Sequence, residues 1–333
     1  MSFLLDVRNL RTRIRGEHAT HTVVDGVSLQ LRPGETLGLV GESGSGKSLT
    51  ALSLTGLLPK PDVFVDGGAM IFQDQDLRAL SPNQFAKLRG DRISMIFQDP
   101  MTALNPVHRI GDQIAEVLTV HGRARKPAQQ KQRVIELLNS VGIPQPESRF
   151  DSYPHELSGG QRQRVMIAMA LACEPALLIA DEPTTALDVT VQAQILHLIK
   201  CLQREHNTAL LFITHDLALV SQISDRIAVM YAGQIVETAA SSTLFAEPRH
   251  PYTRALLAST PSAANGHKQR LPAIPGTVAK PEQYGEYCRF RNRCQHANEH
   301  CRTEAVVMDE SDSAHPVRCL RWRELAQELA HVD

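Results

Sequence analysis

Residues 41–48 form a glycine-rich stretch, Gly41-Glu42-Ser43-Gly44-Ser45-Gly46-Lys47-Ser48. It matches the pattern G-x-x-x-x-G-K-[ST], a loop whose backbone N–H groups surround a polyphosphate, while its lysine meets the β- and γ-phosphates and its last hydroxyl binds Mg²⁺. The apolar run Leu37–Val40 precedes this loop, and we expect a helix from Lys47 to about Leu58, where Pro59 follows. A strand before and a helix after the loop are the context that phosphate binding requires, so the sequence predicts a P-loop nucleotide-binding fold.

Two more motifs follow downstream, Leu157-Ser158-Gly159-Gly160-Gln161 and Leu177-Leu178-Ile179-Ala180-Asp181-Glu182. Asp181 ends an apolar strand, and ligands of open α/β sheets bind at that end of the strands, so Asp181 is expected to hold Mg²⁺ directly or through water. Glu182 is the expected general base for the attacking water, with an acidic helix cap as its alternative role.

A P-loop alone is compatible with kinases, GTPases, helicases and transport ATPases. The three motifs together, in this order, resemble the ATP-binding subunits of ABC transporters. The resemblance implies ATP hydrolysis with ATP and Mg²⁺ bound. It also implies that Ser158, Gly159, Gly160 and Gln161, which are expected to open a helix, close the site of a second ATPase subunit. A chain with one copy of each motif is therefore expected to work as a dimer.

Three single residues have counterparts in that family. His215, after the apolar run Leu210–Thr214, resembles the switch histidine that senses the γ-phosphate. Gln98 resembles the glutamine that contacts Mg²⁺ and water, and the loop after it is implied to contact the membrane subunits. Asp188 resembles the aspartate that links the two ATP sites.

One departure from the family concerns the nucleotide base. An aromatic residue upstream of the P-loop usually stacks on adenine there, yet no Tyr, Phe or Trp occurs between Phe3 and Phe64. Arg15, His18 or His21 could take this place, because guanidinium and imidazole groups also stack. The sequence thus predicts phosphate binding, but it leaves open whether the site prefers adenine over other bases.

Alternating strands and helices predict an α/β protein with a mostly parallel sheet. Short strands in 4–40 make an antiparallel β subdomain, and about 101–164 is an inserted helical subdomain. The other expected elements are strands at 92–97, 176–180 and 209–214, a hairpin of 226–231 with 234–237, and helices at 110–121, 126–141, 160–173 and 190–202. We expect an ATPase domain at 1–247 and an extension at 248–333.

Four of the six cysteines lie in the extension, Cys288, Cys294, Cys301 and Cys319, whereas Cys173 and Cys201 are expected core residues. In a reducing cytosol such a cluster of cysteines indicates a metal site rather than a disulfide. Gaps of 5, 6 and 17 residues suit zinc less well than short knuckles, and four thiolates also suit a [4Fe–4S] cluster. Unligated thiols remain a third possibility.

The extension resembles that of oligopeptide and dipeptide importer ATPases, through Arg249-His250-Pro251-Tyr252-Thr253 and Leu271-Pro272-Ala273-Ile274-Pro275-Gly276. Some members of that group bind an iron–sulfur cluster through similar cysteines.

The composition and net charge argue against a nucleic-acid-binding protein, a lipid-binding protein and a membrane-spanning protein. Hydrophobic residues make up 42% and charged residues 21%, and the net charge of −1 offers no basic field for nucleic acid or anionic lipid. The sequence contains no run of about 18 apolar residues, so it predicts no membrane-spanning helix, and no signal peptide is evident. We expect a cytosolic chain that reaches the membrane through its partners.

The resemblance implies the ATPase subunit of a bacterial importer for di- or oligopeptides, peripheral on the cytoplasmic face of the inner membrane. Its implied partners are a related second ATPase chain in a heterodimer, two transmembrane permease subunits and an extracytoplasmic peptide-binding protein. Nickel, glutathione or cationic peptides are alternative cargoes. A non-transport ABC ATPase is disfavoured because no coiled-coil or zinc-module insertion is seen. Intact Lys47, Glu182 and His215 disfavour a pseudo-ATPase.

Overall fold

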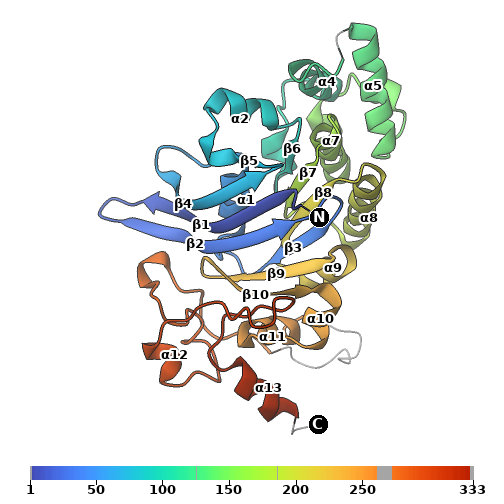
Figure 1. The fold of residues 1–333 in the computed structure, drawn as a ribbon. Coiled ribbons are helices and arrows are strands. Elements are labelled where there is room, and N and C mark those ends of the chain that lie inside the picture. The colour runs from blue at the N-terminus through green and yellow to red at the C-terminus, as the bar shows by residue number, and fades with distance from the viewer. Residues whose placement is uncertain (1, 125, 186, 261–271, 331–333) are drawn as a thin grey trace. The chain divides into compact units, whose positions relative to one another are not determined.

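The computed structural model describes residues 2–124, 126–185, 187–260 and 272–330, so Leu271 of the proline-rich motif lies outside it. The chain divides into two compact units (Figure 1). We call residues 1–4, 31–35 and 72–213 the helical unit, and residues 5–30, 36–71 and 214–333 the P-loop unit. Among the described residues, no helix is long and apolar enough to cross a membrane.

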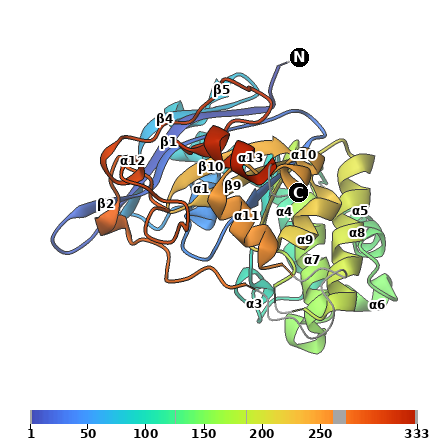
Figure 2. The same ribbon diagram turned by 90° about the horizontal axis from the view of Figure 1, so that it is seen from below.

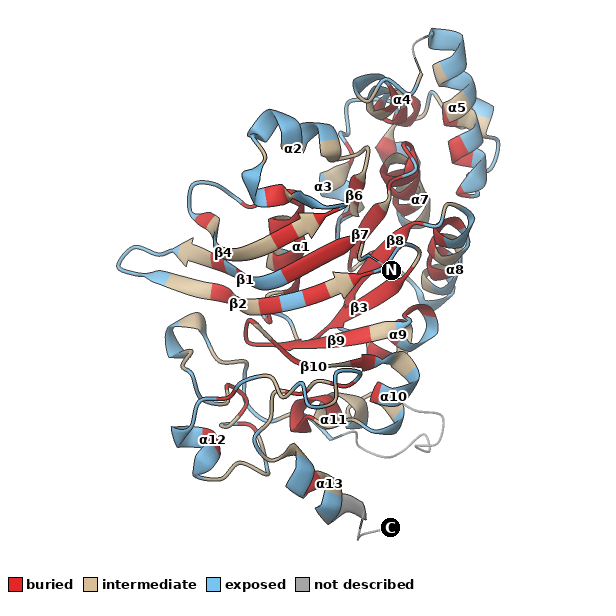
Figure 3. Ribbon diagram, in the orientation of Figure 1, coloured by how far each residue is buried: buried red, intermediate tan, exposed pale blue. Residues whose placement is uncertain are grey.

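The helical unit is built on three parallel strands, β6 (Ile93–Ile96), β7 (Leu177–Asp181) and β8 (Ala209–Thr214), in which β7 pairs with both others. Their residues are almost all buried (Figure 3). Continuous apolar runs form such strands because both faces of a parallel sheet are covered. The strands expected at 176–180 and 209–214 are confirmed, and that expected at 92–97 is shorter by one residue at each end.

Helices make up most of the rest of this unit. The expected helices are confirmed to within a few residues, and α4, α5 and α7 pack on one another. The helices are α2 (Pro82–Leu88), α3 (Pro100–Ala103), α4 (Ile110–Val120), α5 (Pro127–Ser140), α6 (Pro146–Arg149), α7 (Gly159–Leu171) and α8 (Val189–Glu205), with 3₁₀ turns at Leu77–Ala79 and Pro154–Glu156 and a short strand β5 (Gln75–Asp76).

The P-loop unit contains two groups of strands. In the first, β1 (Leu5–Arg15) pairs with β2 (Thr20–Leu31) and β4 (Val63–Phe72). The expectation of short strands in 4–40 was wrong here, because β1 and β2 have 11 and 12 residues and form one long ribbon. In the second, β9 (Arg226–Tyr231) pairs in parallel with β3 (Thr36–Val40) and antiparallel with β10 (Gln234–Ala240), which confirms the expected hairpin.

Helix α1 (Lys47–Thr55) follows the P-loop and ends three residues before the expected Leu58. Gly56 adopts a left-handed conformation at φ 64°, and its N–H bonds to carbonyls of the last turn. A glycine cap of this kind stops a helix before any following proline does. The other helices of this unit are α9 (Leu217–Ile223), α10 (Ser241–Ala246), α11 (Pro251–Ala258), α12 (His300–Thr303) and α13 (Trp322–Ala330), with a 3₁₀ turn at Pro281–Gln283; α10 packs on β9 and β10 (Figure 2).

The extension after β10 is tied to the P-loop unit by a buried carboxylate. Glu237 of β10 is fully buried and accepts hydrogen bonds from the backbone N–H groups of Arg249 (2.6 Å) and His250 (2.9 Å) and from the Nε2 of His315 (2.7 Å). Burial raises the pKa of Glu237. The hydrogen bonds that Glu237 accepts, of which the one from His315 has the largest effect, outweigh burial and hold the pKa below its usual value. Residues 316–318 also bond to the backbone of β10, so its outer edge is covered.

Candidate nucleotide-binding site

In the P-loop unit, β3 ends at Val40 and the glycine-rich loop leads directly into α1. The Nζ of Lys47, a residue only 5% exposed, donates to the carbonyls of Gly41 (2.7 Å) and Glu42 (3.0 Å). At Gly46 the backbone has φ 105°, and a Cβ there would lie 2.8 Å from the Cε of Met230. Glycine is required at position 46 because a side chain would be strained at this backbone angle. The two hydrogen bonds of Lys47 hold its positive charge over the loop.

The start of α1 has the features of a phosphate-binding helix. No side chain caps its N-terminus, so no capping side chain competes with a ligand for the first N–H groups of the helix. The Oγ of Ser45 is buried and has no hydrogen-bond partner among the described residues. An N-terminal dipole with uncapped N–H groups, a buried hydroxyl and a lysine fit the phosphates of ATP.

In the helical unit, the structure brings together two residues that were predicted separately. Glu182 follows β7, and its Oε2 accepts hydrogen bonds from the Nε2 of Gln98 (3.1 Å) and the Oγ1 of Thr185 (3.1 Å). Its backbone is left-handed at φ 47°, a strained conformation for a non-glycine residue that is typical of functional sites. Asp181 before it is buried. Glu182 is not a helix cap, because Asp188 caps the next helix.

Asp188 caps one helix, and two residues of the Leu157–Gln161 motif, Ser158 and Gln161, cap another. The side chain of Asp188 accepts from the N–H of Val191 (2.9 Å) at the start of α8. Ser158 and Gln161 form a reciprocal capping box at the start of α7, with bonds of 3.1 and 3.3 Å. The expectation that Ser158–Gln161, hereafter the signature, opens a helix is confirmed, while the roles of these residues toward a second ATP site stay predictions.

His215 and the candidates for stacking on the base lie in the P-loop unit. His215 is exposed directly after β8, where Asp216 caps α9. The guanidinium of Arg15 lies 5.1 Å from the ring centre of Phe64, so this candidate already stacks on an aromatic ring.

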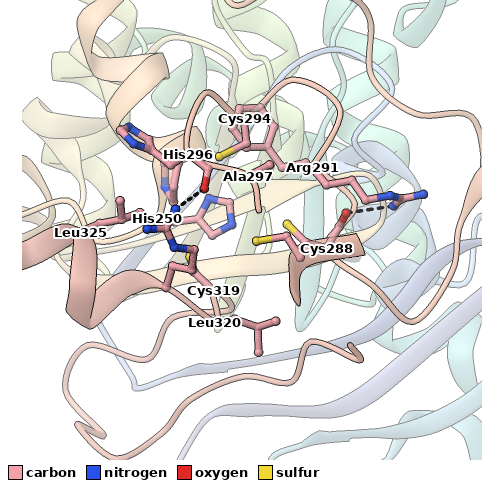
Figure 4. Close-up of a pocket in the computed structure, with 13 residues that line it drawn as sticks. His250, Cys288, Arg291, Cys294, His296, Ala297, Cys319, Leu320 and Leu325 are labelled. Carbon is pink, nitrogen blue, oxygen red and sulfur yellow. Dashed lines mark hydrogen bonds between the residues drawn. The ribbon is translucent and has the colours of Figure 1, made fainter. Parts of the chain in front are cut away.

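The four cysteines of the extension line one small cavity, together with His250 and Phe290 (Figure 4). Burial raises the pKa of Cys288 to about 11 and that of Cys319 to about 12, and also raises the pKa of Cys294. All six cysteines are free, and Cys201 is exposed, contrary to the expectation of a core residue. No group of three or more His, Cys, Asp or Glu side chains within the described ranges could hold a metal ion as placed.

Comparison with known proteins identifies the same modules. The family described as "ABC transporter" matches residues 24–185, and the "Oligopeptide/dipeptide transporter, C-terminal region" matches residues 236–301. The chain is 51% identical to the probable peptide ABC transporter ATP-binding protein y4tR of Sinorhizobium fredii, over 97% of this chain and 96% of the relative. It is 49% identical to the oligopeptide transport ATP-binding protein AppD of Bacillus subtilis, over 97% and 98%.

A third relative is the dipeptide transport ATP-binding protein DppD of Escherichia coli, 48% identical over 95% of this chain and 96% of the relative. Among solved structures, the dimeric post-hydrolysis state of the ATP-binding cassette MJ0796 bound to ADP and Pi is similar with a TM-score of 0.64. It is 28% identical and covers 71% of this chain and 98% of that one. The chain cbiO1 of Clostridium perfringens has a TM-score of 0.63 and 27% identity, over 74% of this chain and 92% of that one.

Proposed function

Because this chain belongs to the ATP-binding subunits of ABC transporters, and carries the C-terminal region of oligopeptide and dipeptide transporters, we propose that it powers the import of di- and oligopeptides. The chain is an ATPase of this family. The observation that carries the peptide cargo is the near full-length similarity, extension included, to proteins named for peptide transport. We take residues 1–247 as the ATPase domain, with a helical subdomain at about 101–164, and 248–333 as the extension.

Each proposed role follows from the chemistry of the side chain. Lys47 and the P-loop N–H groups bind the phosphates, and Glu182, oriented by Gln98 and Thr185, accepts a proton from the attacking water. His215 senses the γ-phosphate. The residues that would hold Mg²⁺ are Ser48, Gln98 and Asp181, and the ion, when bound, would supply positive charge that offsets the charge of the phosphates.

The proposed assembly contains a second, related ATPase chain. Two ATP molecules would lie between the P-loop of one chain and the Ser158–Gln161 signature of the other, with Asp188 linking the two sites. Two permease subunits would hold this chain at the cytoplasmic face of the inner membrane, and an extracytoplasmic binding protein would deliver the peptide. We favour a heterodimer, because importers of this type commonly use two ATPases.

The cargo is tested by uptake in the native host. A strain whose only copy carries Lys47→Ala should lose uptake of labelled di- and oligopeptides, because phosphate binding is lost, while uptake of unrelated solutes continues. The same strain complemented with the wild-type gene is the control. If peptide uptake is unchanged and uptake of nickel, glutathione or cationic peptides is lost instead, the peptide assignment is wrong.

We propose further that the cysteines of the extension bind a [4Fe–4S] cluster. The donors suit it, since four thiols and no carboxylate line one cavity. The cavity offers only about 10 Å³, the space of about one water, so the thiols would have to turn toward the cluster. Cys288, Cys294, Cys301 and Cys319 would be the ligands, and a structural link between the loops of the extension is the proposed role.

Metal content tests this assignment. Chain purified without oxygen is expected to contain about four iron and four sulfide per molecule, with visible absorption that Cys319→Ala abolishes. The matched control is Cys173→Ala, which changes a buried cysteine of the helical unit that does not line the cavity. About one zinc per chain would identify a zinc site instead. Chain that purifies without metal and does not take up iron and sulfide would show unligated thiols.

A further inference from the structure

The second residue of the P-loop is bound by the C-terminal extension. The carboxylate of Glu42 accepts two hydrogen bonds from Arg293, from Nη1 at 2.5 Å and from Nη2 at 2.9 Å. The side chain of Arg293 is 6% exposed and that of Glu42 is 29% exposed. A two-pronged contact between a guanidinium and a carboxylate is the strongest form of this pair, so the contact fixes both side chains.

The backbone of Glu42 is held from the same side. Its N–H donates to the Oη of Tyr252 at 2.9 Å, and Tyr252 is fully buried in α11. Burial raises the pKa of Tyr252, so its hydroxyl stays protonated. The carbonyl of Glu42 accepts from Lys47, the residue that meets the phosphates. Glu42 therefore joins the extension to the P-loop lysine through its carboxylate, its N–H and its carbonyl.

Arg293 itself is fixed by its surroundings. Its Nε donates to the carbonyl of Pro275 at 2.7 Å, and its guanidinium lies near the rings of Tyr231 (5.8 Å) and Phe290 (6.0 Å). Tyr231, Tyr252 and Phe290 pack together with ring centres 4.6 to 5.3 Å apart. Such a pre-ordered arginine holds its partner at little further cost in entropy.

We propose that Arg293 is a positioning residue for ATP binding, which neutralises Glu42 and fixes the first half of the P-loop. The need follows from charge, because ATP brings several negative charges to a loop that contains a carboxylate five positions before its lysine. Without a partner, that carboxylate would repel the phosphates and be free to turn toward Lys47. The inference rests on the assignment of the P-loop to ATP and is independent of the peptide cargo.

The test is the affinity of the purified full chain for Mg²⁺-ATP, measured by calorimetry. Arg293→Gln is expected to weaken binding by about 10- to 100-fold. Without Arg293, the negative charge of Glu42 would repel the phosphates through a medium of intermediate dielectric constant. The double variant Glu42→Gln with Arg293→Gln is expected to recover to within about 3-fold of the wild type, since both charges are gone. Added salt should reduce the defect of the single variant, because it screens the repulsion.

Arg291→Gln is the matched control. Arg291 lies two positions earlier in the same loop and donates to the carbonyl of Cys288 at 2.9 Å, so this variant should bind ATP like the wild type. A purely structural role for Arg293 predicts that the single and double variants lose affinity equally, which would overturn the proposal. So would an Arg293→Gln variant with unchanged affinity. If that variant does not fold, Arg293→Lys with and without Glu42→Gln decides in the same way, with a smaller expected loss of about 3- to 10-fold.

Discussion

Replacing Glu182 with glutamine is expected to slow ATP hydrolysis by about 10²- to 10⁴-fold while ATP still binds. The amide has the size of the carboxylate but cannot accept the proton of the attacking water. Gln98 and Thr185 both donate to Glu182, so an amide oxygen can still accept at the same place. Steady-state phosphate release and ATP binding, measured on the same preparation, separate the two effects.

The control for this variant is Glu205→Gln, which removes an exposed carboxylate at the end of α8 in the same unit. Its hydrolysis rate should equal that of the wild type. A Glu182→Gln chain that keeps more than about a third of the wild-type rate would rule out Glu182 as the general base, because losing such a base costs far more than threefold.

His250 is expected to make the protein less stable in mild acid, by about 3 kcal/mol at pH 4. Burial lowers the pKa of His250 to about 4, and the charges of Arg318 and Arg254 oppose its protonation while Glu237 partly favours it. The unfolded chain takes up a proton near pH 6.5, which the native chain does not. Stability from this group is thus complete above pH 6.5 and is lost as the pH falls toward 4.

The urea midpoint at several pH values measures this effect. The nitrogen Nδ1 of His250 caps α11 by accepting from the N–H of Tyr252 at 3.0 Å. His250→Asn keeps a side-chain acceptor at this cap and cannot titrate, so its midpoint should change less between pH 6.5 and 4.5. Because the chain has 14 histidines, only the difference between the two curves reports on His250. Parallel curves would show that His250 is not the group responsible.

Local patterns predicted the elements that carry the chemistry. The strands before Gly41 and Asp181 are unbroken apolar runs that end at the motif residues, and these fix both the strands and their functional ends. Helix α1 ends before the expected Leu58 because Gly56 stops it ahead of Pro59, and glycine is the usual helix-ending residue. The capping box of Ser158 and Gln161 was visible as S-x-x-Q.

Contacts between distant parts of the chain were beyond such patterns. Position 42 is an unspecified residue of the P-loop pattern, so the pattern does not indicate that the carboxylate of Glu42 has a specific partner. Its partner Arg293 lies 251 positions later, in a loop whose sequence pattern is dominated by its cysteines. The meeting of Gln98 with Glu182 likewise depends on the neighbouring strands β6 and β7, which local periodicity does not pair.

The separation of Glu42 from Arg293 also sets the order of events during synthesis. At about 5 to 20 residues per second, a ribosome needs about 13 to 50 s to add the 251 residues between them. During this interval the nascent P-loop exposes an uncompensated carboxylate, so ATP would bind about 10- to 100-fold more weakly and stabilise the newly folded strands less. The nucleotide thus reaches its full stabilising effect only after Arg293, which begins about the last eighth of the chain, has left the ribosome. A chain terminated before Arg293 would bind ATP more weakly and gain less protection against proteolysis from it.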